Sequence, residues 1–319
     1  MIKIDRNFIL AIITLSVLVI TVFVVAMGFG KKSTVTPYLE GDEMLILPQN
    51  LNQVYSLPDT LFFAGERMPL ENFDTRESLE RELIMSAYRH SSTIMIIKKA
   101  NRYFPIIEPI LREYNIPDDF KYLVAAESEF ANVISPAGAT GFWQIMQATG
   151  REEGLEINTV VDERYNLEKS TEFACKYFLK SFEQFGNWTL VAASYNGGRA
   201  AVQKQIDIQK QTNYYDLLLS EETARYLFRV AAYKLIINDP KSYGFDIAEK
   251  DLYKPLNFRE VEVDTAINDF AEFAEQFGTN YKILKFLNPW LRKPYLTARA
   301  NKRYIIKVPD GDMRSYTEQ

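Results

Sequence analysis

The spacing of apolar residues changes character along the chain and divides it into four parts. Residues 8–29 form an apolar run without a single charge, and residues 30–74 contain scattered Pro, Gly, Asn and Asp without sustained periodicity. Residues 75–250 carry apolar positions at helical spacing, whereas residues 256–310 mix helical and alternating patterns. The pattern therefore predicts a membrane span, a tether, an all-α domain and a small mixed module, followed by a short tail at 311–319.

The central part predicts a series of helices. The stretch TRESLERELIMSAYRHSSTIMIIKKANRYF has the spacing of one long amphipathic helix with a break near Ser91. IIEPILREY predicts a second helix and PDDFKYLVAAES a third, for which Pro117 and Asp118 are start signals. Further helical patterns reach Asn238, and strand patterns are nearly absent in this part.

The last part predicts a strand-helix-helix-strand module. FREVEVD (258–264) and KRYIIKVP (302–309) alternate like strands, and two helical patterns lie between them. The first of these helices has four apolar side chains on one face, Ala266, Phe270, Phe273 and Phe277. The fold class we expect is mainly α, with a small C-terminal α+β module.

The apolar run at 8–29 has the length of a single transmembrane helix, which needs about 20 apolar residues. A cleaved signal peptide usually has a shorter apolar region. We therefore expect an uncleaved signal anchor, with residues 1–7 before it and the tether 30–74 after it. Basic residues flank the run on both sides, so charge alone leaves the orientation open.

Composition excludes several kinds of chemistry. The net charge of −5 argues against a nucleic-acid-binding protein, which usually has a basic face. The sequence contains one cysteine, Cys175, and one histidine, His90. These counts exclude an intrachain disulfide and a Cys/His zinc site. A Ser-His-Asp or Cys-His catalytic system would need His90, and no nucleophile motif is paired with it. We expect no metal and no cofactor.

Glu127 is the candidate catalytic residue. Phe120, Leu123, Val124 and Glu127 recur at i, i+3, i+4 and i+7, which places the acid on the apolar face at the end of a helix. Apolar surroundings and the helix dipole both raise a carboxyl pKa, as a general acid requires. From periodicity alone, a solvent-exposed helix-end glutamate is the alternative. Glu129 faces elsewhere, so no second carboxylate is marked by its spacing.

Four ordered motifs follow one another across about 100 residues. They are Glu127-Ser128, then SPAGATGFWQ (135–144), YNGG (195–198) and ETARY (222–226). This order resembles the lytic transglycosylases of the soluble-lytic-transglycosylase superfamily, and most of all their D-type membrane-bound members. The resemblance covers about residues 60 to 245. It implies a goose-lysozyme-like α fold and cleavage of the β-1,4 bond between MurNAc and GlcNAc in peptidoglycan, with formation of 1,6-anhydromuramoyl ends.

The resemblance also implies roles for individual residues. Glu127 would act as acid and then as base, and Tyr195 would position the acid and the substrate. Ser135 would bond the sugar N-acetyl group or the Glu127 carboxyl, and Trp143 would stack on a sugar as a cleft wall. The remaining expected substrate-binding residues are Gln144, Asn196, Glu222 and Tyr226. The substrate implies that the catalytic domain lies on the periplasmic or cell-wall side of the membrane, with the N-terminus inside.

The C-terminal module resembles a LysM module. Asp264-Thr265 and Asn288 match its pattern, although Val263 stands where the family has Gly. The resemblance implies binding of GlcNAc-rich glycan, and a structural appendage packed on the catalytic domain is the alternative.

Other functions stay open at the level of sequence. A hydrolytic muramidase of the same fold would need Asp162 or Glu163 to steer a water molecule. A catalytically inactive wall-binding scaffold would have no reason to keep all four of Glu127, Gln144, Tyr195 and Asn196. A membrane-tethered helical adaptor would not account for the ordered motifs.

Overall fold

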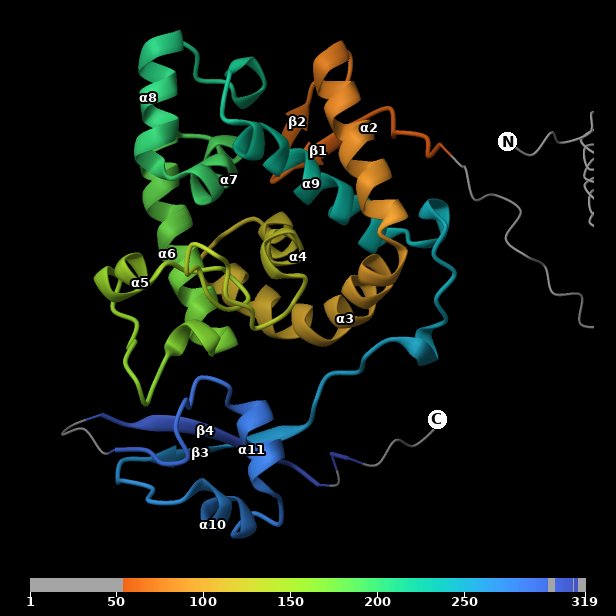
Figure 1. Cartoon of the computed structure of the whole chain (residues 1–319). Helices are drawn as coiled ribbons and strands as arrows, with labels where there is room; N and C mark the ends of the chain where they lie inside the picture. The colour runs from red at the N-terminus through yellow and green to blue at the C-terminus, as the bar shows by residue number, and fades with distance from the viewer. Residues whose placement is uncertain (1–53, 298–301, 312, 315–319) are drawn as a thin grey trace, which may run out of the picture. The chain divides into compact units, whose positions relative to one another are not determined.

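The computed structural model describes residues 54–297, 302–311 and 313–314. Its larger part is helical (Figure 1). The helices of this part are α2 (Phe73–Tyr88), α3 (His90–Glu113), α4 (Leu123–Ser128), α5 (Gln147–Glu152), α6 (Leu167–Phe185), α7 (Trp188–Gly197), α8 (Arg199–Gln209) and α9 (Glu221–Asn238). The prediction of a mainly helical domain is confirmed for these residues.

The long helix at the start of the domain breaks where the pattern indicates. α2 ends at Tyr88 and α3 begins at His90, within a few residues of Ser91. The separate second helix predicted from IIEPILREY is wrong, because α3 runs without interruption through Pro105 and Pro109. Each proline removes one backbone hydrogen bond. The helix nevertheless continues, since the apolar face on either side of both prolines is buried, with Phe104, Ile107 and Leu111 in the core.

α7 is the central helix of the domain. It packs against α6, α8 and α9, and every side chain from Thr189 to Ser194 is buried. The Asn187 side chain caps its start by accepting a hydrogen bond from the backbone N–H of Leu190 at 2.8 Å. A helix buried all round needs apolar and small residues on every face, which TLVAAS supplies.

The segment before α2 is folded, which corrects the predicted extent of the tether. β1 (Leu61–Phe63) and β2 (Glu66–Met68) form an antiparallel hairpin whose inward side chains join the main core. The Glu66 carboxylate accepts hydrogen bonds from the backbone N–H groups of Trp188 and Thr189, at 2.6 and 2.9 Å. The hairpin thus helps to cap α7. Residues 54–74 therefore belong to the folded unit and not to a tether.

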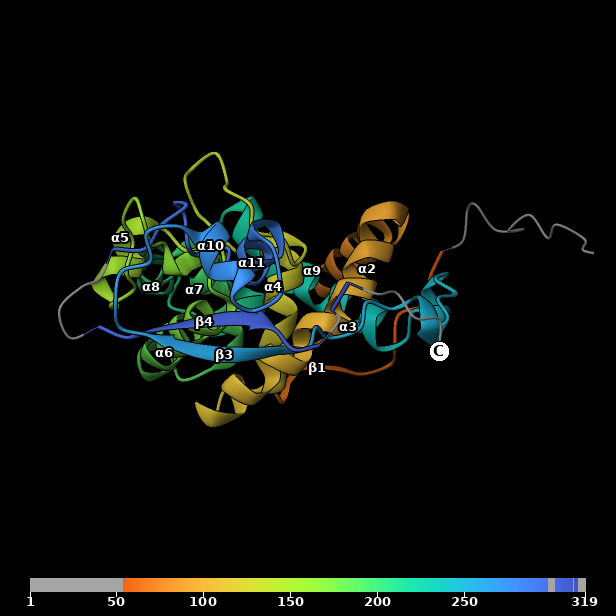
Figure 2. The same ribbon diagram turned by 90° about the horizontal axis from the view of Figure 1, so that it is seen from below.

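The C-terminal module has the predicted strand-helix-helix-strand order. β3 (Phe258–Val263) pairs antiparallel with β4 (Tyr304–Pro309), and α10 (Phe270–Glu275) and α11 (Tyr281–Leu287) lie between them in the chain. Figure 2 shows the two strands side by side, with both helices on one side of the pair. The module has its own core, which includes Phe270, Leu284, Trp290, Ile306 and Val308.

The predicted membrane span at 8–29 lies outside the described residues, as does most of the predicted tether. Within the part of the chain that the structure describes, no helix combines the length and the apolar character needed to cross a bilayer.

Candidate active site

Glu127 lies in the last turn of α4, a helix of only six residues. A 3₁₀ turn (Asp118–Tyr122) leads into α4, and Glu129 ends it in the left-handed conformation with φ of 52°. The Tyr226 hydroxyl donates a hydrogen bond to Glu127 Oε1 at 2.5 Å. Tyr226 itself is buried in α9, so the acid is held by a side chain that packing has already fixed.

Burial raises the pKa of the Glu127 carboxyl from 4.5 to about 7. The Tyr226 hydrogen bond and the Arg229 charge oppose this rise in pKa, whereas the Glu222 charge adds to it. A group with a pKa near 7 is populated in both protonation states at neutral pH. Glu127 can therefore donate a proton in one step and accept a proton in the next.

Residues 133–145 reverse direction twice and form a compact turn beside Glu127. The backbone N–H of Ser135 donates to the Ala139 carbonyl at 2.8 Å, and Thr140 and Ile145 exchange both backbone hydrogen bonds. Gly141 has φ of +83°, and a Cβ atom there would overlap the carbonyl oxygen of Arg164. Only glycine fits this position, because any other residue would be strained and would clash with backbone.

Ser128 connects α4 to this turn. Its buried hydroxyl donates to the carbonyl of Phe142 at 2.8 Å. The serine that follows the acid in the motif therefore holds the turn and the acid together. Sequence reasoning did not assign Ser128 this role, although its place in the Glu-Ser motif was the available signal.

The Gln144 side chain stabilises the turn by donating hydrogen bonds to two of its backbone carbonyls. Its Nε2 donates to the carbonyls of Gly141 at 2.8 Å and Val133 at 3.1 Å, and its backbone has φ of 48°. No described residue donates a hydrogen bond to its Oε1, so this acceptor is available to a ligand.

Ser135 lies in the turn but has a local role. Its Oγ accepts a hydrogen bond from the backbone N–H of Ala139 at 3.0 Å, and no bond to the Glu127 carboxyl is found among the described residues. This contact closes the turn, in the manner typical of serine in loops.

Trp143 does not form a cleft wall, and that expectation is wrong. Its side chain is fully buried, and its Nε1–H donates to the Thr171 hydroxyl at 2.8 Å. Its ring packs edge-on against Phe178 and Tyr195. A side chain with no exposed face has no surface on which a sugar can stack, so Trp143 supports the turn from the core.

The YNGG motif connects the centre of the domain to the acid. The Tyr195 hydroxyl donates to the Trp143 carbonyl at 2.7 Å, and Asn196 Oδ1 accepts from the Thr223 hydroxyl at 3.0 Å. A Cβ atom on Gly197 would approach Thr223 Oγ1 to 2.7 Å, so glycine allows α7 and α9 to meet closely. Tyr195 therefore positions the turn, and Asn196 positions the start of α9.

Glu222 lies on α9 one turn before Tyr226. Its side chain is 58% exposed and forms an ion pair with Arg229 at 2.9 Å. The Arg229 guanidinium also lies 3.4 Å from the buried carboxylate of Glu82. Glu222 thus influences the acid through charge, and Arg229 is a nearby cation that sequence reasoning did not single out.

The two carboxylates considered for a hydrolytic mechanism are both engaged. Asp162 forms a buried ion pair with Arg164 at 2.8 Å. Glu163 accepts from the backbone N–H of Glu156 at 2.6 Å and pairs with Lys302 at 3.3 Å. Among the described residues, no group of three or more His, Cys, Asp and Glu side chains is arranged to hold a metal ion.

Two family descriptions match the chain. Residues 104–218 match the transglycosylase SLT domain, and residues 259–312 match the soluble lytic transglycosylase C-terminal LysM-like domain. The membrane-bound lytic murein transglycosylase D of Escherichia coli strain K12 is 28% identical over 263 residues, which cover 80% of this chain and 57% of that protein. The same figures hold for its counterpart in strain O6:H1. The chain thus spans just over half the length of these relatives.

Two solved structures are also similar. An inactive mutant of the lytic transglycosylase Slt from Pseudomonas aeruginosa is 19% identical with a TM-score of 0.35, over 47% of this chain and 26% of that one. The 70 kDa soluble lytic transglycosylase of Escherichia coli is 18% identical with a TM-score of 0.40, over 56% and 32% of the two chains. From the sequence matches, the chain contains a transglycosylase SLT domain followed by a LysM-like domain, and it is homologous to membrane-bound lytic murein transglycosylase D.

Proposed function

We propose that this chain is a peptidoglycan lytic transglycosylase that cleaves the β-1,4 bond between MurNAc and GlcNAc and leaves a 1,6-anhydromuramoyl end. The observation that carries the proposal is the state of Glu127. It is a carboxyl whose pKa burial raises to about 7, and Tyr226 holds it at 2.5 Å. Glu127 lies within residues 104–218, which match the SLT domain, and the relatives of the chain are named lytic murein transglycosylases.

In the proposed reaction, protonated Glu127 first donates its proton to the glycosidic oxygen, and the GlcNAc chain leaves as an alcohol. The carboxylate then accepts the proton of the MurNAc C6 hydroxyl while that oxygen attacks C1. One C–O bond breaks, another forms, and no water is consumed. The Tyr226 hydroxyl stabilises the carboxylate between the two steps, since it donates to Oε1.

The turn beside the acid supplies the binding groups in this proposal. Gln144 Oε1 is an acceptor without a partner among the described residues, and it suits the N–H of an N-acetyl group. Tyr195 and Ser128 hold the turn at Trp143 and Phe142 and thereby fix the position of Gln144 against Glu127. Such preorganisation of rigid groups is what positioning a substrate requires.

The engaged state of Asp162 and Glu163 favours the transglycosylase over the hydrolytic muramidase. A hydrolase of this type needs a second carboxylate that is free to activate water. Both acids are committed to ion pairs, and Glu163 also accepts a backbone hydrogen bond, so neither carboxylate is free to take a proton from water. The substrate's own C6 hydroxyl then remains as the nucleophile.

The proposed location is the outer side of a cell membrane. The apolar run at 8–29 suits a single span, and the relatives are described as membrane-bound. Peptidoglycan lies outside the cytoplasmic membrane, so the SLT and LysM-like domains would face outward. There the enzyme would serve in remodelling or turnover of the wall.

The test is digestion of purified peptidoglycan with the full chain, followed by mass spectrometry of the products. Wild type is expected to release 1,6-anhydro muropeptides, and Glu127→Gln is expected to release none. Glu77→Gln is the matched control, because Glu77 is exposed on α2 and the same change of charge is made there. Products with reducing MurNAc ends would identify a muramidase. Undiminished digestion by Glu127→Gln would remove Glu127 from the mechanism.

A further inference from the structure

One loop of the SLT domain is shared with the core of the LysM-like module. We call residues 156–166 the junction loop. Val161 and Tyr165 from this loop are buried in the same apolar cluster as Phe270, Leu291 and Ile306 of the module. Two backbone hydrogen bonds join the segments, from Asp162 N to the Trp290 carbonyl at 2.9 Å and from Arg292 N to the Val160 carbonyl at 2.7 Å. The junction loop is therefore built into the module.

Charged contacts surround this shared core. Lys302 of the module forms ion pairs with Glu156 and Glu163 of the junction loop. Arg292 lies over the Tyr165 ring with its guanidinium carbon 4.0 Å from the ring centroid. The Glu156 side chain is only 5% exposed, so its pair is screened less by salt than a surface pair.

Arg164 of the same loop contacts the turn at 133–145 beside Glu127, which we call the catalytic turn. Arg164 forms a two-pronged pair with Asp162, with Nε and Nη2 at 3.0 and 2.8 Å from its two oxygens. Its Nη1 donates to the carbonyls of Gly138 at 3.3 Å and Ile145 at 3.2 Å. Its own carbonyl lies against Gly141. The buried Arg164 side chain thus pairs with Asp162 of the junction loop and also donates hydrogen bonds to the turn that carries Gln144.

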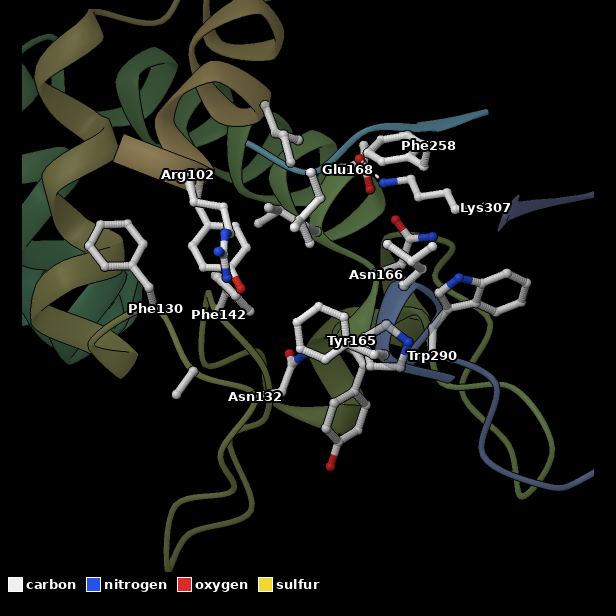
Figure 3. A pocket seen from close by; sticks show the side chains of 18 residues that line it. Arg102, Phe130, Asn132, Phe142, Tyr165, Asn166, Glu168, Phe258, Trp290 and Lys307 are labelled. Atoms are coloured by element: carbon white, nitrogen blue, oxygen red, sulfur yellow. Dashed lines mark hydrogen bonds and ion pairs between the residues drawn. The ribbon is translucent and has the colours of Figure 1, made fainter. Parts of the chain in front are cut away.

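Elsewhere the two parts leave a space between them. A cavity of about 350 Å³ is lined by residues of both parts. In Figure 3, Phe130 and Phe142 of the SLT domain lie on one side of it, and Trp290 and Lys307 of the module lie on the other. The contacts described above link the module to the turn at 133–145 through the junction loop and Arg164.

We propose that the LysM-like module buttresses the catalytic turn, and that Arg164 is the positioning residue that transmits this support to Gly138, Gly141 and Gln144. The inference rests on the proposed function and extends it, since it assigns the module a role in turnover itself. A module that supports the catalytic turn differs from a module that only anchors the chain to glycan. An anchor changes the affinity for the substrate, whereas a buttress changes the geometry of the bound state and hence the rate of the chemical step.

The test compares two pairs of substitutions on the module. Lys302→Ala with Arg292→Ala removes the two cations that contact the junction loop. Lys282→Ala with Arg259→Ala removes the same charge from exposed positions, where Arg259 lies over the Phe277 ring of the module itself. Both pairs are made in the full chain, and circular dichroism checks that each variant is folded.

The first readout does not depend on activity. Selective ¹⁵N labelling of the 14 glycines allows the amide resonances of Gly138 and Gly141 to be followed. The junction pair is expected to shift both resonances, and the control pair is expected to leave them in place. A folded junction variant with unmoved glycine resonances would overturn the proposal.

The second readout separates a buttress from an anchor. On soluble glycan strands, the junction pair is expected to lower kcat about tenfold with KM changed less than about twofold, since misplacement of a catalytic group acts on the chemical step. A raised KM with unchanged kcat would mean a glycan anchor and would contradict the buttress.

A substitution of Arg164 itself completes the test. Arg164→Lys keeps the charge but loses the planar fork that bonds Asp162 and two carbonyls at once. It is expected to shift the same glycine resonances and to lower kcat. An inactive wild type would refute the proposed function and leave the resonance test of the coupling intact.

Discussion

The raised pKa of the half-buried Glu127 carboxyl leads to a prediction about stability that needs no substrate. Glu127→Gln replaces the carboxyl with a neutral group of nearly the same shape, whose oxygen can still accept the Tyr226 hydrogen bond. Below pH 4.5 the wild-type acid is protonated in both the folded and the unfolded state. Between pH 4.5 and about 7 the unfolded chain loses this proton first, because the folded pKa is raised. The free energy of unfolding of the wild type therefore falls relative to the variant as pH rises.

The size of this effect follows from the pKa. A rise from 4.5 to about 7 corresponds to about 3 kcal/mol at about 1.4 kcal/mol per pKa unit, and this is an upper limit since Glu127 is partly exposed. Most of the effect develops between pH 5 and pH 8. The stability advantage of Glu127→Gln over wild type is expected to grow by about 2 kcal/mol across this range.

The assay is urea denaturation followed by far-ultraviolet circular dichroism at pH 5 and pH 8. Taking the difference between variant and wild type cancels the other titrating groups, which the two proteins share. Glu77→Gln is the control, and its difference from wild type is expected to stay the same at both pH values. An equal difference for Glu127→Gln at both pH values would show that the acid is not desolvated, and the argument for its role as general acid would fail.

Three further predictions concern residues near Glu127. Tyr226→Phe removes the hydrogen bond that favours the carboxylate, so the pKa of Glu127 rises further and the basic limb of the pH profile of kcat/KM moves to higher pH. Gly141→Ala is expected to lower the free energy of unfolding, measured in urea, by about 3 kcal/mol or more, whereas Gly138→Ala is expected to lower it by only about 1 kcal/mol. Both glycines have positive φ, but only at Gly141 would the added Cβ atom meet a backbone carbonyl. Trp143→Phe is expected to lower the melting temperature in calorimetry without raising KM, because the indole is buried.

The elements that could be predicted from sequence are those with a long, periodic pattern. The break between α2 and α3 and the two strands of the module fall where the pattern placed them. The hairpin of β1 and β2 could not be predicted, because strands of three residues are too short to show alternation. The continuity of α3 through Pro105 and Pro109 was missed because burial of its apolar face outweighs the lost hydrogen bonds.

In the candidate site, too, local sequence patterns predict some features, whereas others depend on contacts made only in the fold. Helical periodicity is enough to place Glu127 on an apolar face, but its partner Tyr226 lies 99 residues later, and only the fold brings the two together. Trp143 was misjudged because its motif lies beside the acid. The partner of its indole N–H, Thr171, lies 28 residues away on α6 and is invisible to a local pattern. The role of Arg164 likewise depends on contacts with Gly138 and Ile145 that spacing does not predict.

The central claim is that Glu127 acts alone because the substrate supplies its own nucleophile. It is tested most directly by digesting peptidoglycan with the full chain in water enriched in ¹⁸O and measuring the masses of the released muropeptides. The account predicts products one water lighter than reducing muropeptides and free of ¹⁸O. Products that carry one ¹⁸O at the MurNAc end would mean that water attacks C1, and they would contradict the account.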